Sequence, residues 1–220
     1  MNDIAPGRFL TLEGGEGTGK STFAKVLGQR LEALGLRVLI TREPGGTPLA
    51  EAARTLLLHP PEGEVWTGLS EALLVNAARK DHVEKRIRPA LAAGHWVICD
   101  RFADSTRVYQ GLAGDVAMQT LLAIERDVLG TTVPHRTLVL DAPLDVALAR
   151  RTVRGGASDT FEARPEAFHE AVRLAFLKVA ASEPHRCRVI NAALAPEDVM
   201  RAVWDAIEDL LPLDAEARPA

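Results

Sequence analysis

The sequence lacks the marks of several large protein classes. No apolar run approaches the roughly 20 residues of a membrane-spanning helix, and residues 1–7 have neither the basic nor the apolar part of a secretory signal. Basic residues are not in excess, because the net charge is −4, which argues against a general nucleic-acid-binding protein. We therefore expect a cytoplasmic protein without nucleic-acid or membrane partners.

Cysteine is scarce as well. Cys99 and Cys187 each lie in an apolar, strand-like run, which favours buried free thiols in a reducing compartment over a disulfide. No group of cysteines and histidines has metal-ligand spacing, and we expect the six scattered histidines to lie in loops or on the surface. A Gly-x-Ser-x-Gly nucleophile elbow is also missing, so no serine nucleophile of that kind is expected.

The size and composition of the chain fit one folded unit. Of its 220 residues 47% are apolar and 25% are charged, which is enough for one sizeable core and too little for two comfortable domains. The sequence has no internal repeat and no low-complexity tract. We expect a single domain over residues 1–211, followed by a disordered tail over residues 212–220.

The most informative stretch lies near the start of the chain. It matches the phosphate-loop pattern and consists of Gly14-Gly15-Glu16-Gly17-Thr18-Gly19-Lys20-Ser21. The apolar residues 9–12 before it predict a buried strand, and the apolar spacing within residues 22–34 predicts a helix after it. Glycines let backbone N–H groups turn around phosphate oxygens, and the helix N-terminus adds the positive end of a dipole. Lys20 is therefore expected to bridge the outer phosphates of a nucleotide, and Ser21 to hold Mg²⁺.

The rest of the chain alternates between predicted strands and helices. Further strands are predicted at residues 37–41, 95–99, 136–140 and 188–190. Helices are predicted at residues 48–58, 69–93, 104–111, 115–129, 143–151, 165–181 and 196–211, and a mobile loop at residues 152–160. This alternation predicts an α/β fold with a five-stranded parallel sheet and helices on both faces, whose ligands bind at the carboxyl ends of the strands.

Polar residues gather where the predicted strands end. The phosphate loop, Arg42-Glu43, Asp100-Arg101, Asp141 and Asn191 each follow such a strand. A carboxylate directly after a buried strand helps to hold Mg²⁺ in phosphate-loop proteins, so Asp100 is the second expected metal ligand. The alternative is a turn at the sheet edge in which Asp100 pairs with Arg101.

Arginines outside the phosphate loop suggest a second phosphate site. Arg79 has no acidic residue three or four positions away on its predicted helix, so the usual ion pair within the helix is not available. Because a guanidinium matches phosphate bidentately, we interpret Arg79 as a phosphate ligand, and the alternative is a solvated side chain.

A second group of arginines lies in a predicted lid. Arg150, Arg151 and Arg154 precede Gly155-Gly156, and this pattern suits a segment over about residues 150–161 that closes over phosphates and excludes water. The alternative is a solvated basic turn at a helix C-terminus, where positive charge is favourable. Glu16 is unusual, since an acid in the phosphate loop faces negative phosphates; we expect it to point to a hydroxyl group of a ligand or to a magnesium-bound water.

These motifs together resemble the bacterial thymidylate kinases. The resemblance covers about residues 8–211 and is carried by residues 14–21, 41–47, 77–79, 100–106 and 109–111. It implies a phosphate-loop nucleoside monophosphate kinase fold with a short lid. It also implies transfer of a phosphoryl group from ATP to dTMP with Mg²⁺, giving dTDP for dTTP biosynthesis, usually in a homodimer.

The resemblance implies roles for individual residues. ATP is expected on Gly14, Gly15, Glu16, Gly17, Thr18, Gly19, Lys20, Ser21 and Thr22, with Arg150 near adenine. Glu16 is expected to contact the 3′-hydroxyl of dTMP, and Arg79 and Arg101 its phosphate, with Arg42 nearby. The rest of the dTMP pocket is expected to be lined by Pro44, Val75, Ser105, Thr106, Tyr109 and Gln110. The phosphate loop has no arginine, so the chain is similar to the subgroup in which a lid arginine, here Arg154, stabilises the transferring phosphoryl group. The residues expected to act in catalysis are Lys20, Arg101, Arg154 and Glu16.

One position departs from the family pattern. The family usually has a phenylalanine four residues before the arginine at Arg79, where it stacks on thymine, and this chain has Val75. Another aromatic side chain, such as Phe102 or Trp66, is the alternative source of a stacking surface.

Two other functions stay open at this point. One is a kinase for a different nucleoside or nucleotide, which a substrate panel would distinguish. The other is a phosphate-loop ATPase or GTPase switch, which would hydrolyse nucleotide without a small-molecule acceptor; a second set of phosphate-binding arginines argues against it.

Overall fold

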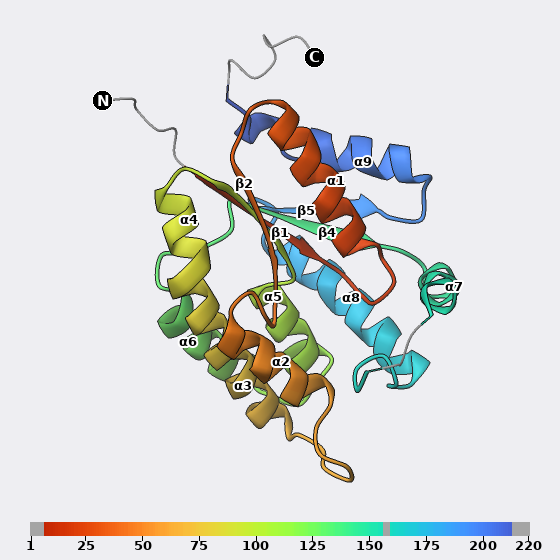
Figure 1. Ribbon diagram of the computed structural model, residues 1–220. Helices are drawn as coiled ribbons and strands as arrows, with labels where there is room; N and C mark the ends of the chain where they lie inside the picture. The colour runs from red at the N-terminus through yellow and green to blue at the C-terminus, as the bar shows by residue number, and fades with distance from the viewer. Residues whose placement is uncertain (1–6, 156–158, 213–220) are drawn as a thin grey trace.

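The computed structural model describes residues 7–155 and 159–212. Within them the chain forms a parallel sheet of five strands in the order β2-β3-β1-β4-β5 (Figure 1). The strands are β1 (Arg8–Glu13), β2 (Val38–Arg42), β3 (Trp96–Asp100), β4 (Arg136–Asp141) and β5 (Cys187–Asn191). The predicted sheet and all five strand positions are confirmed, with ends that shift by one or two residues.

Each of the eight predicted helices has a helical counterpart in the described residues, although two of them are interrupted or continued by π-helical turns. They are α1 (Lys20–Ala33), α2 (Pro48–Leu58), α3 (Gly68–His82), α4 (Arg88–Ala92), α5 (Ala103–Thr106), α6 (Met118–Leu129), α7 (Leu144–Arg154), α8 (Glu166–Ser182) and α9 (Pro196–Asp205). The predicted helix 69–93 is α3 and α4 joined by a π-helical turn, η1 (Val83–Ile87), and a second such turn, η2 (Arg107–Leu112), follows α5. A 3₁₀ turn, η3 (Glu208–Leu210), ends the last helical region.

Two helix boundaries show why local sequence signals work or fail. Thr47 begins α2 as expected, because its hydroxyl accepts a hydrogen bond from the N–H of Ala50 and Pro48 occupies the first helical position. Helix α7 instead continues to Arg154, three residues beyond its predicted end, so the first part of the predicted loop 152–160 is helical. The rest of that loop includes residues 156–158, which lie outside the described residues, as does most of the expected tail 212–220.

Alternation along β1 divides the core between the two faces of the sheet. Leu10 and Leu12 belong to a cluster with the apolar faces of α1 and α9. Phe9 points to the other face and packs among residues of β3, η1, α4 and the end of α6. On that second face a further cluster gathers around α8, with Tyr109 and Phe176 in it. Helices therefore cover both faces, as expected, with α1 and α9 together on one of them (Figure 1).

Strand register brings the functional segments together. Leu12 of β1 is paired with Asp100 of β3, and Arg42 of β2 is paired with the same residue. The carboxyl ends of β1, β2 and β3 therefore lie side by side, and the phosphate loop leaves the sheet at this point. Cys99 and Cys187 are both buried free thiols, as the sequence predicted. Among the described helices, none combines the length and apolar character that crossing a membrane requires.

Candidate active site

The phosphate loop connects β1 to α1 by a turn that only glycine tolerates at several positions. Gly14 and Gly17 have φ values of 135° and 80°, in the left-handed region. A Cβ atom at Gly17 would lie 2.3 Å from the carbonyl oxygen of Ala147, so α7 packs directly on the loop. Helix α1 then begins at Lys20 without a side-chain cap, which leaves its first N–H groups free to bind an anion.

Lys20 lies inside this loop and is bound to it. Its Nζ donates to the carbonyl oxygens of Gly14 at 3.1 Å and Gly15 at 2.6 Å, and the side chain is buried. Burial, with a smaller contribution from the Arg101 charge, lowers the pKa of Lys20 to about 8. A bound polyphosphate would reverse this shift because negative charge favours the ammonium form.

Ser21 and Asp100 meet across the mouth of the loop. The Ser21 hydroxyl donates a hydrogen bond to Oδ2 of Asp100, although the two residues are 79 positions apart in the chain. A hydroxyl and a carboxylate are hard oxygen donors of the kind that Mg²⁺ prefers, and both face the same cavity. The donor set therefore fits the expected magnesium ion.

One cavity of about 730 Å³ receives most of the predicted site residues. From the phosphate loop and α1 it is lined by Glu16, Gly17, Gly19, Lys20, Ser21 and Thr22. From the other elements it is lined by Arg42, Pro44, Val75, Arg79, Asp100, Arg101, Ser105, Thr106, Tyr109, Gln110 and Arg150. Gly14, Gly15 and Thr18 line a separate small recess behind the loop, towards β4 and α8. The backbone of Arg154 ends α7, but its side chain lies outside the described part of the structure.

Glu16 and Arg101 form an ion pair inside this cavity. Their closest approach is 2.6 Å, from Nη2 of Arg101 to Oε1 of Glu16. The Tyr109 hydroxyl donates to the same carboxylate oxygen at 3.3 Å, and the Arg101 guanidinium lies over the Tyr109 ring at 5.1 Å. Burial raises the pKa of Tyr109, which keeps its hydroxyl a donor. Glu16 is thus held by protein groups at the position where the sequence suggested a ligand.

Arg79 is buried rather than solvated, with 2% of its surface exposed. Its Nε pairs with Glu43 at 2.6 Å, a residue on a different element, which explains the missing partner on its own helix. It also donates to Asn76 Oδ1, the Phe102 carbonyl and the Thr106 hydroxyl. Four hydrogen bonds from five N–H groups leave little capacity for the bidentate phosphate contact that the sequence suggested.

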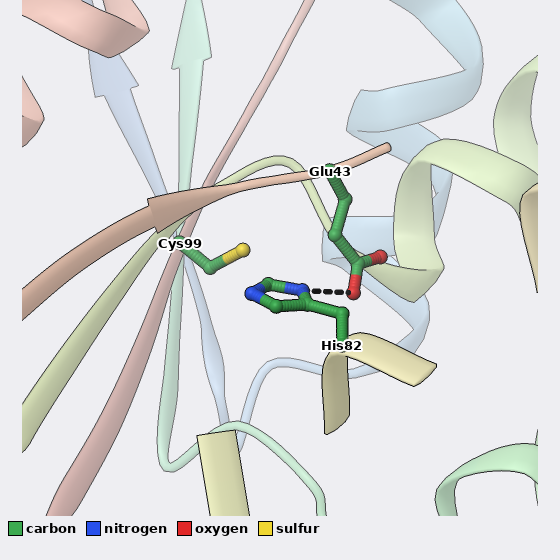
Figure 2. Close-up of side chains that lie close together, drawn as sticks. All are labelled: Glu43, His82 and Cys99. Atoms are coloured by element: carbon green, nitrogen blue, oxygen red, sulfur yellow. Dashed lines mark hydrogen bonds and ion pairs between the residues drawn. The ribbon is translucent and has the colours of Figure 1, made fainter. Parts of the chain in front are cut away.

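Glu43 is itself held by a histidine that the sequence assigned to the surface (Figure 2). His82 is fully buried, and its Nδ1 lies 3.0 Å from Oε1 of Glu43 while its Nε2 lies 2.7 Å from the Thr41 hydroxyl. His169 is also buried, so the expectation of surface histidines was wrong for these two. Tertiary contacts decided both cases, since both nitrogens of His82 have partners and Nε2 of His169 lies beside Arg151.

The side chains in Figure 2 also have the composition of a metal site. Ligand atoms of Glu43, His82 and Cys99 all lie within 4.8 Å of one another, a grouping that the scattered sequence positions did not suggest. Each atom already has a protein partner, since the Cys99 thiol donates to the carbonyl of Arg101. Burial raises the pKa of this thiol well above its usual value, whereas metal binding requires the thiolate. The cluster is therefore a hydrogen-bonded support for Arg79.

The wall of the cavity near α3 is apolar and contains an aromatic ring that the sequence analysis missed. Val75 is buried in one cluster with Tyr109 and Phe161. Phe161 lines the cavity and packs edge-on against Tyr109 at 5.5 Å. Of the two suggested aromatic side chains, Phe102 lines the cavity but packs edge-on against Phe9, and Trp66 does not line it. A single phenylalanine in a predicted loop gives no sequence signal of its direction, so Phe161 could not be chosen in advance.

The remaining predicted arginines are held less firmly. Arg42 is largely exposed and pairs with Glu51 at 2.9 Å. Arg150 donates to the carbonyl of Ala192 at 2.7 Å, which places the N-terminal side of the lid against the segment before α9. Arg151, which was not assigned a role, donates to the Glu162 carbonyl and lies 3.3 Å from His169. It joins the two sides of the lid.

The comparisons with known proteins agree with this geometry. A family model described as thymidylate kinase matches residues 12–203. A thymidylate kinase from Rhizorhabdus wittichii is 52% identical over 211 residues, covering 94% of this chain and 100% of that protein. One from Bradyrhizobium sp. (strain ORS 278) is 50% identical over 207 residues, covering 93% and 91%.

A solved structure adds the same likeness in three dimensions. The crystal structure of thymidylate kinase from Ehrlichia chaffeensis has a TM-score of 0.72 and 31% sequence identity to this chain, and covers 94% of this chain and 99% of its own. The family match covers most of the chain. The phosphate loop, the paired strand ends and the residues that line the cavity all lie within it. The chain belongs to the thymidylate kinase family.

Proposed function

We propose that the chain transfers the terminal phosphoryl group of ATP to dTMP, giving dTDP for dTTP synthesis. The observation that carries this proposal is that two groups of residues, one suited to a phosphate donor and one to an acceptor, line the same cavity. The phosphate loop with Lys20 lies on one side, and Arg101 with the Val75–Tyr109 wall lies on the other. A nucleotide switch needs the first set alone, whereas a nucleotide kinase needs both.

The donor side binds ATP through the loop and α1. Backbone N–H groups and Lys20 hold the phosphates, and Arg150 lies towards the adenine. Ser21 and Asp100 would hold Mg²⁺, and when bound this ion offsets negative charge on the phosphate oxygens. The loss of the hydrogen bond between Ser21 and Asp100 would free both oxygens for that role.

The acceptor side binds dTMP between α3 and the segment after β3. Arg101 holds the acceptor phosphate, Arg42 lies nearby, and Glu16 receives the sugar 3′-hydroxyl after exchanging part of its pairing with Arg101. Pro44, Thr106, Tyr109 and Gln110 surround the sugar and base. Arg79 lies one helical turn beyond Val75 and donates to Thr106, and this contact supports a role on the base side of the pocket over a role at the phosphate.

The chemistry follows from charge and positioning. The attacking group is a phosphate oxygen of dTMP, already anionic near neutral pH, so the reaction needs no strong general base. Two anionic nucleotides must be brought in line, and Lys20, Arg101 and the lid residue Arg154 offset their repulsion. The lid over about residues 150–161 closes on the same domain, which extends over residues 1–211, and excludes water from the transferring group.

The chain is also proposed to act as a homodimer in the cytoplasm. Helices α2 and α3 pack together, and each carries exposed apolar side chains, with Leu49 66% and Leu73 52% exposed. Leu56 and Leu69 are exposed as well. A second copy would cover these side chains; sedimentation of the protein and of Leu73→Glu tests the dimer. Two buried free thiols support a reducing compartment.

The reaction is tested with a panel of acceptors. ATP turnover is measured with dTMP, dUMP, dCMP, dGMP and thymidine in separate reactions. We expect dTDP formation with dTMP to exceed transfer to the other acceptors. Turnover that is independent of any acceptor would instead support an NTPase, and preference for another monophosphate would redirect the substrate assignment.

A further inference from the structure

Glu13, the last residue of β1, holds the turn that carries Arg101. Its side chain is fully buried, and its Oε1 accepts hydrogen bonds from the backbone N–H groups of Phe102 at 2.8 Å and Ser105 at 3.3 Å. Its Oε2 accepts the Ser105 hydroxyl at 2.6 Å. One carboxylate therefore collects three donors from the segment that follows β3.

That segment has an unusual backbone. Among the described residues, Arg101 is the one non-glycine residue with positive φ, at 69°. Its own N–H continues the sheet by bonding to the carbonyl of Leu12, and the chain turns sharply immediately afterwards. A conformation that side chains rarely adopt persists only where neighbouring contacts fix it, and the Glu13 carboxylate supplies the contacts on the far side of the turn.

The same carboxylate reaches the guanidinium through one hydroxyl. Nη1 of Arg101 donates to Ser105 Oγ at 3.2 Å, and this hydroxyl in turn donates to Glu13. The chain of donors runs in one direction, from Arg101 through Ser105 to Glu13. Glu13 is not among the residues that line the cavity, so it does not contact a ligand there, and Ser105 connects it to the Arg101 guanidinium.

We propose that Glu13 is a positioning residue that holds Arg101, through Ser105 and the turn after β3, in the orientation that receives the acceptor phosphate. The proposal rests on the proposed function, in which Arg101 binds the phosphate of dTMP. It assigns a role to a buried acid that precedes the phosphate loop and touches neither nucleotide.

The ionisation of Glu13 gives the proposal a second readout. Burial, and next the charge of Asp104, raise the pKa of Glu13 to about 7, and bonds from Ser105 and Phe102 oppose this shift. An ionised carboxylate accepts hydrogen bonds from all three donors. A protonated one donates a hydrogen bond itself, which reverses the direction of its hydrogen bond with the Ser105 hydroxyl. The charged and titratable groups around it are Asp104, Arg101, Lys20, Tyr109, Cys99 and Cys187, with Arg186 paired to Asp104. Affinity for dTMP is therefore expected to fall as the pH falls through about 7.

The test uses Glu13→Gln, Ser105→Ala and the double variant, with calorimetric titration of dTMP and, separately, ATP. Glutamine keeps the acceptor for the N–H groups and donates to Ser105, as protonated glutamic acid does. Glu125→Gln is the matched control, because Glu125 is a partly buried acid paired with Arg107 outside the cavity. Its dTMP and ATP affinities are expected to equal those of the unmodified protein.

We expect each single variant to weaken dTMP binding by roughly tenfold, the effect of losing one charge-assisted hydrogen bond, with ATP affinity changed less than about twofold. The double variant is expected to be no weaker than Glu13→Gln, because both changes break the same chain. The pH dependence of dTMP affinity between about pH 6 and pH 8 should be smaller in Glu13→Gln, since the titration of Glu13 no longer contributes to it.

Three outcomes would overturn the proposal. They are unchanged dTMP affinity in folded Glu13→Gln, equal losses for ATP and dTMP, and fully additive losses in the double variant. If Glu13→Gln does not fold, Ser105→Ala decides alone, because it removes the hydroxyl that joins Arg101 to Glu13 and leaves the carboxylate itself in place. Failure of the unmodified protein to bind dTMP would contradict the proposed function instead, so the two failures are distinguishable.

Discussion

The phosphate loop and the acceptor pocket face the same cavity, but different contacts hold them in shape. Within the loop, side chains bond to the loop's own backbone, as Lys20 does to the carbonyls of Gly14 and Gly15. The hydrogen bond of Ser21 with Asp100 is a contact to a distant segment. In the acceptor pocket the hydrogen bonds join distant segments: Arg79 is bound to Glu43, 36 positions away, and Arg101 to Glu16, 85 positions away. The loop is thus a backbone structure, whereas the acceptor pocket is a network of buried charged side chains.

This difference has consequences for substitution. A side chain of the loop can be removed without removing the backbone turn that binds phosphate. A buried charge of the acceptor pocket cannot be removed without leaving its partner unpaired. We therefore expect losses of function without loss of fold on the loop side, and combined losses on the acceptor side.

The largest effect is expected at Glu43. Glu43→Gln leaves the buried guanidinium of Arg79 without its counter-charge and should lower the free energy of unfolding by about 3–5 kcal/mol. Urea denaturation measures the change. Glu51→Gln is the control, because Glu51 pairs with Arg42 at the surface and should cost less than about 1 kcal/mol. Similar small losses for both would show that the buried network does not hold the pocket.

Lys20 tests the loop side of the comparison. Lys20→Ala should lower turnover by at least ~10²–10³-fold, the range found for single charge-stabilising groups, while the protein stays folded. Steady-state rates and thermal unfolding measure the two properties, and the exposed Lys25 of α1, changed to alanine, is the control. A Lys20→Ala protein with near-normal activity would remove the phosphate-loop argument.

Arg154 should act on the rate and not on binding. Arg154→Ala is expected to lower kcat by ~10²-fold with little change in the affinity for either nucleotide, because a lid arginine is needed mainly in the transition state. Single-turnover rates with calorimetric affinities separate the two. A loss confined to ATP affinity would assign Arg154 to ground-state binding instead.

Arg101, in contrast to Arg154, should act on the binding of one nucleotide. Arg101→Ala is expected to weaken dTMP binding by roughly 10–100-fold, since a hydrogen bond to a charged group contributes ~1.5–3 kcal/mol, while ATP affinity stays nearly constant. Titration of each nucleotide into the variant gives both values. Equal losses for ATP and dTMP would contradict the assignment of Arg101 to the acceptor phosphate.

The smallest effect is expected at Val75. If Val75 faces the base, Val75→Phe should tighten dTMP binding by up to about tenfold, because aromatic pairing adds ~0.5–1.5 kcal/mol beyond burial of area. Calorimetric titration of dTMP measures it, and ATP affinity should not change. Unchanged or weaker binding by a folded variant would mean that Phe161 already fills this side of the pocket, in which case Phe161→Leu should weaken dTMP binding.

The fold was predicted correctly, and the predicted donor-side residues lie together in the structure, because the determinants of both are local. The run of apolar strand, glycine loop and helix fixes the phosphate loop within residues 9–34, and alternating strands and helices favour one parallel sheet. Asp100 could be placed beside Ser21 because parallel strands end at one edge. The Thr47 cap and the buried thiols follow from equally short patterns.

The acceptor side depended on information that no short pattern holds. The sequence by itself determined that Arg79 lacked an acidic partner on its helix, but only the tertiary structure selected Glu43, and through it the buried His82. It likewise brought Phe161 against Tyr109 and Glu13 under the Arg101 turn. A buried charge is tolerated only where a partner lies within hydrogen-bond distance. The partners here come from elements far apart in the chain, so only the folded structure brings them within that distance.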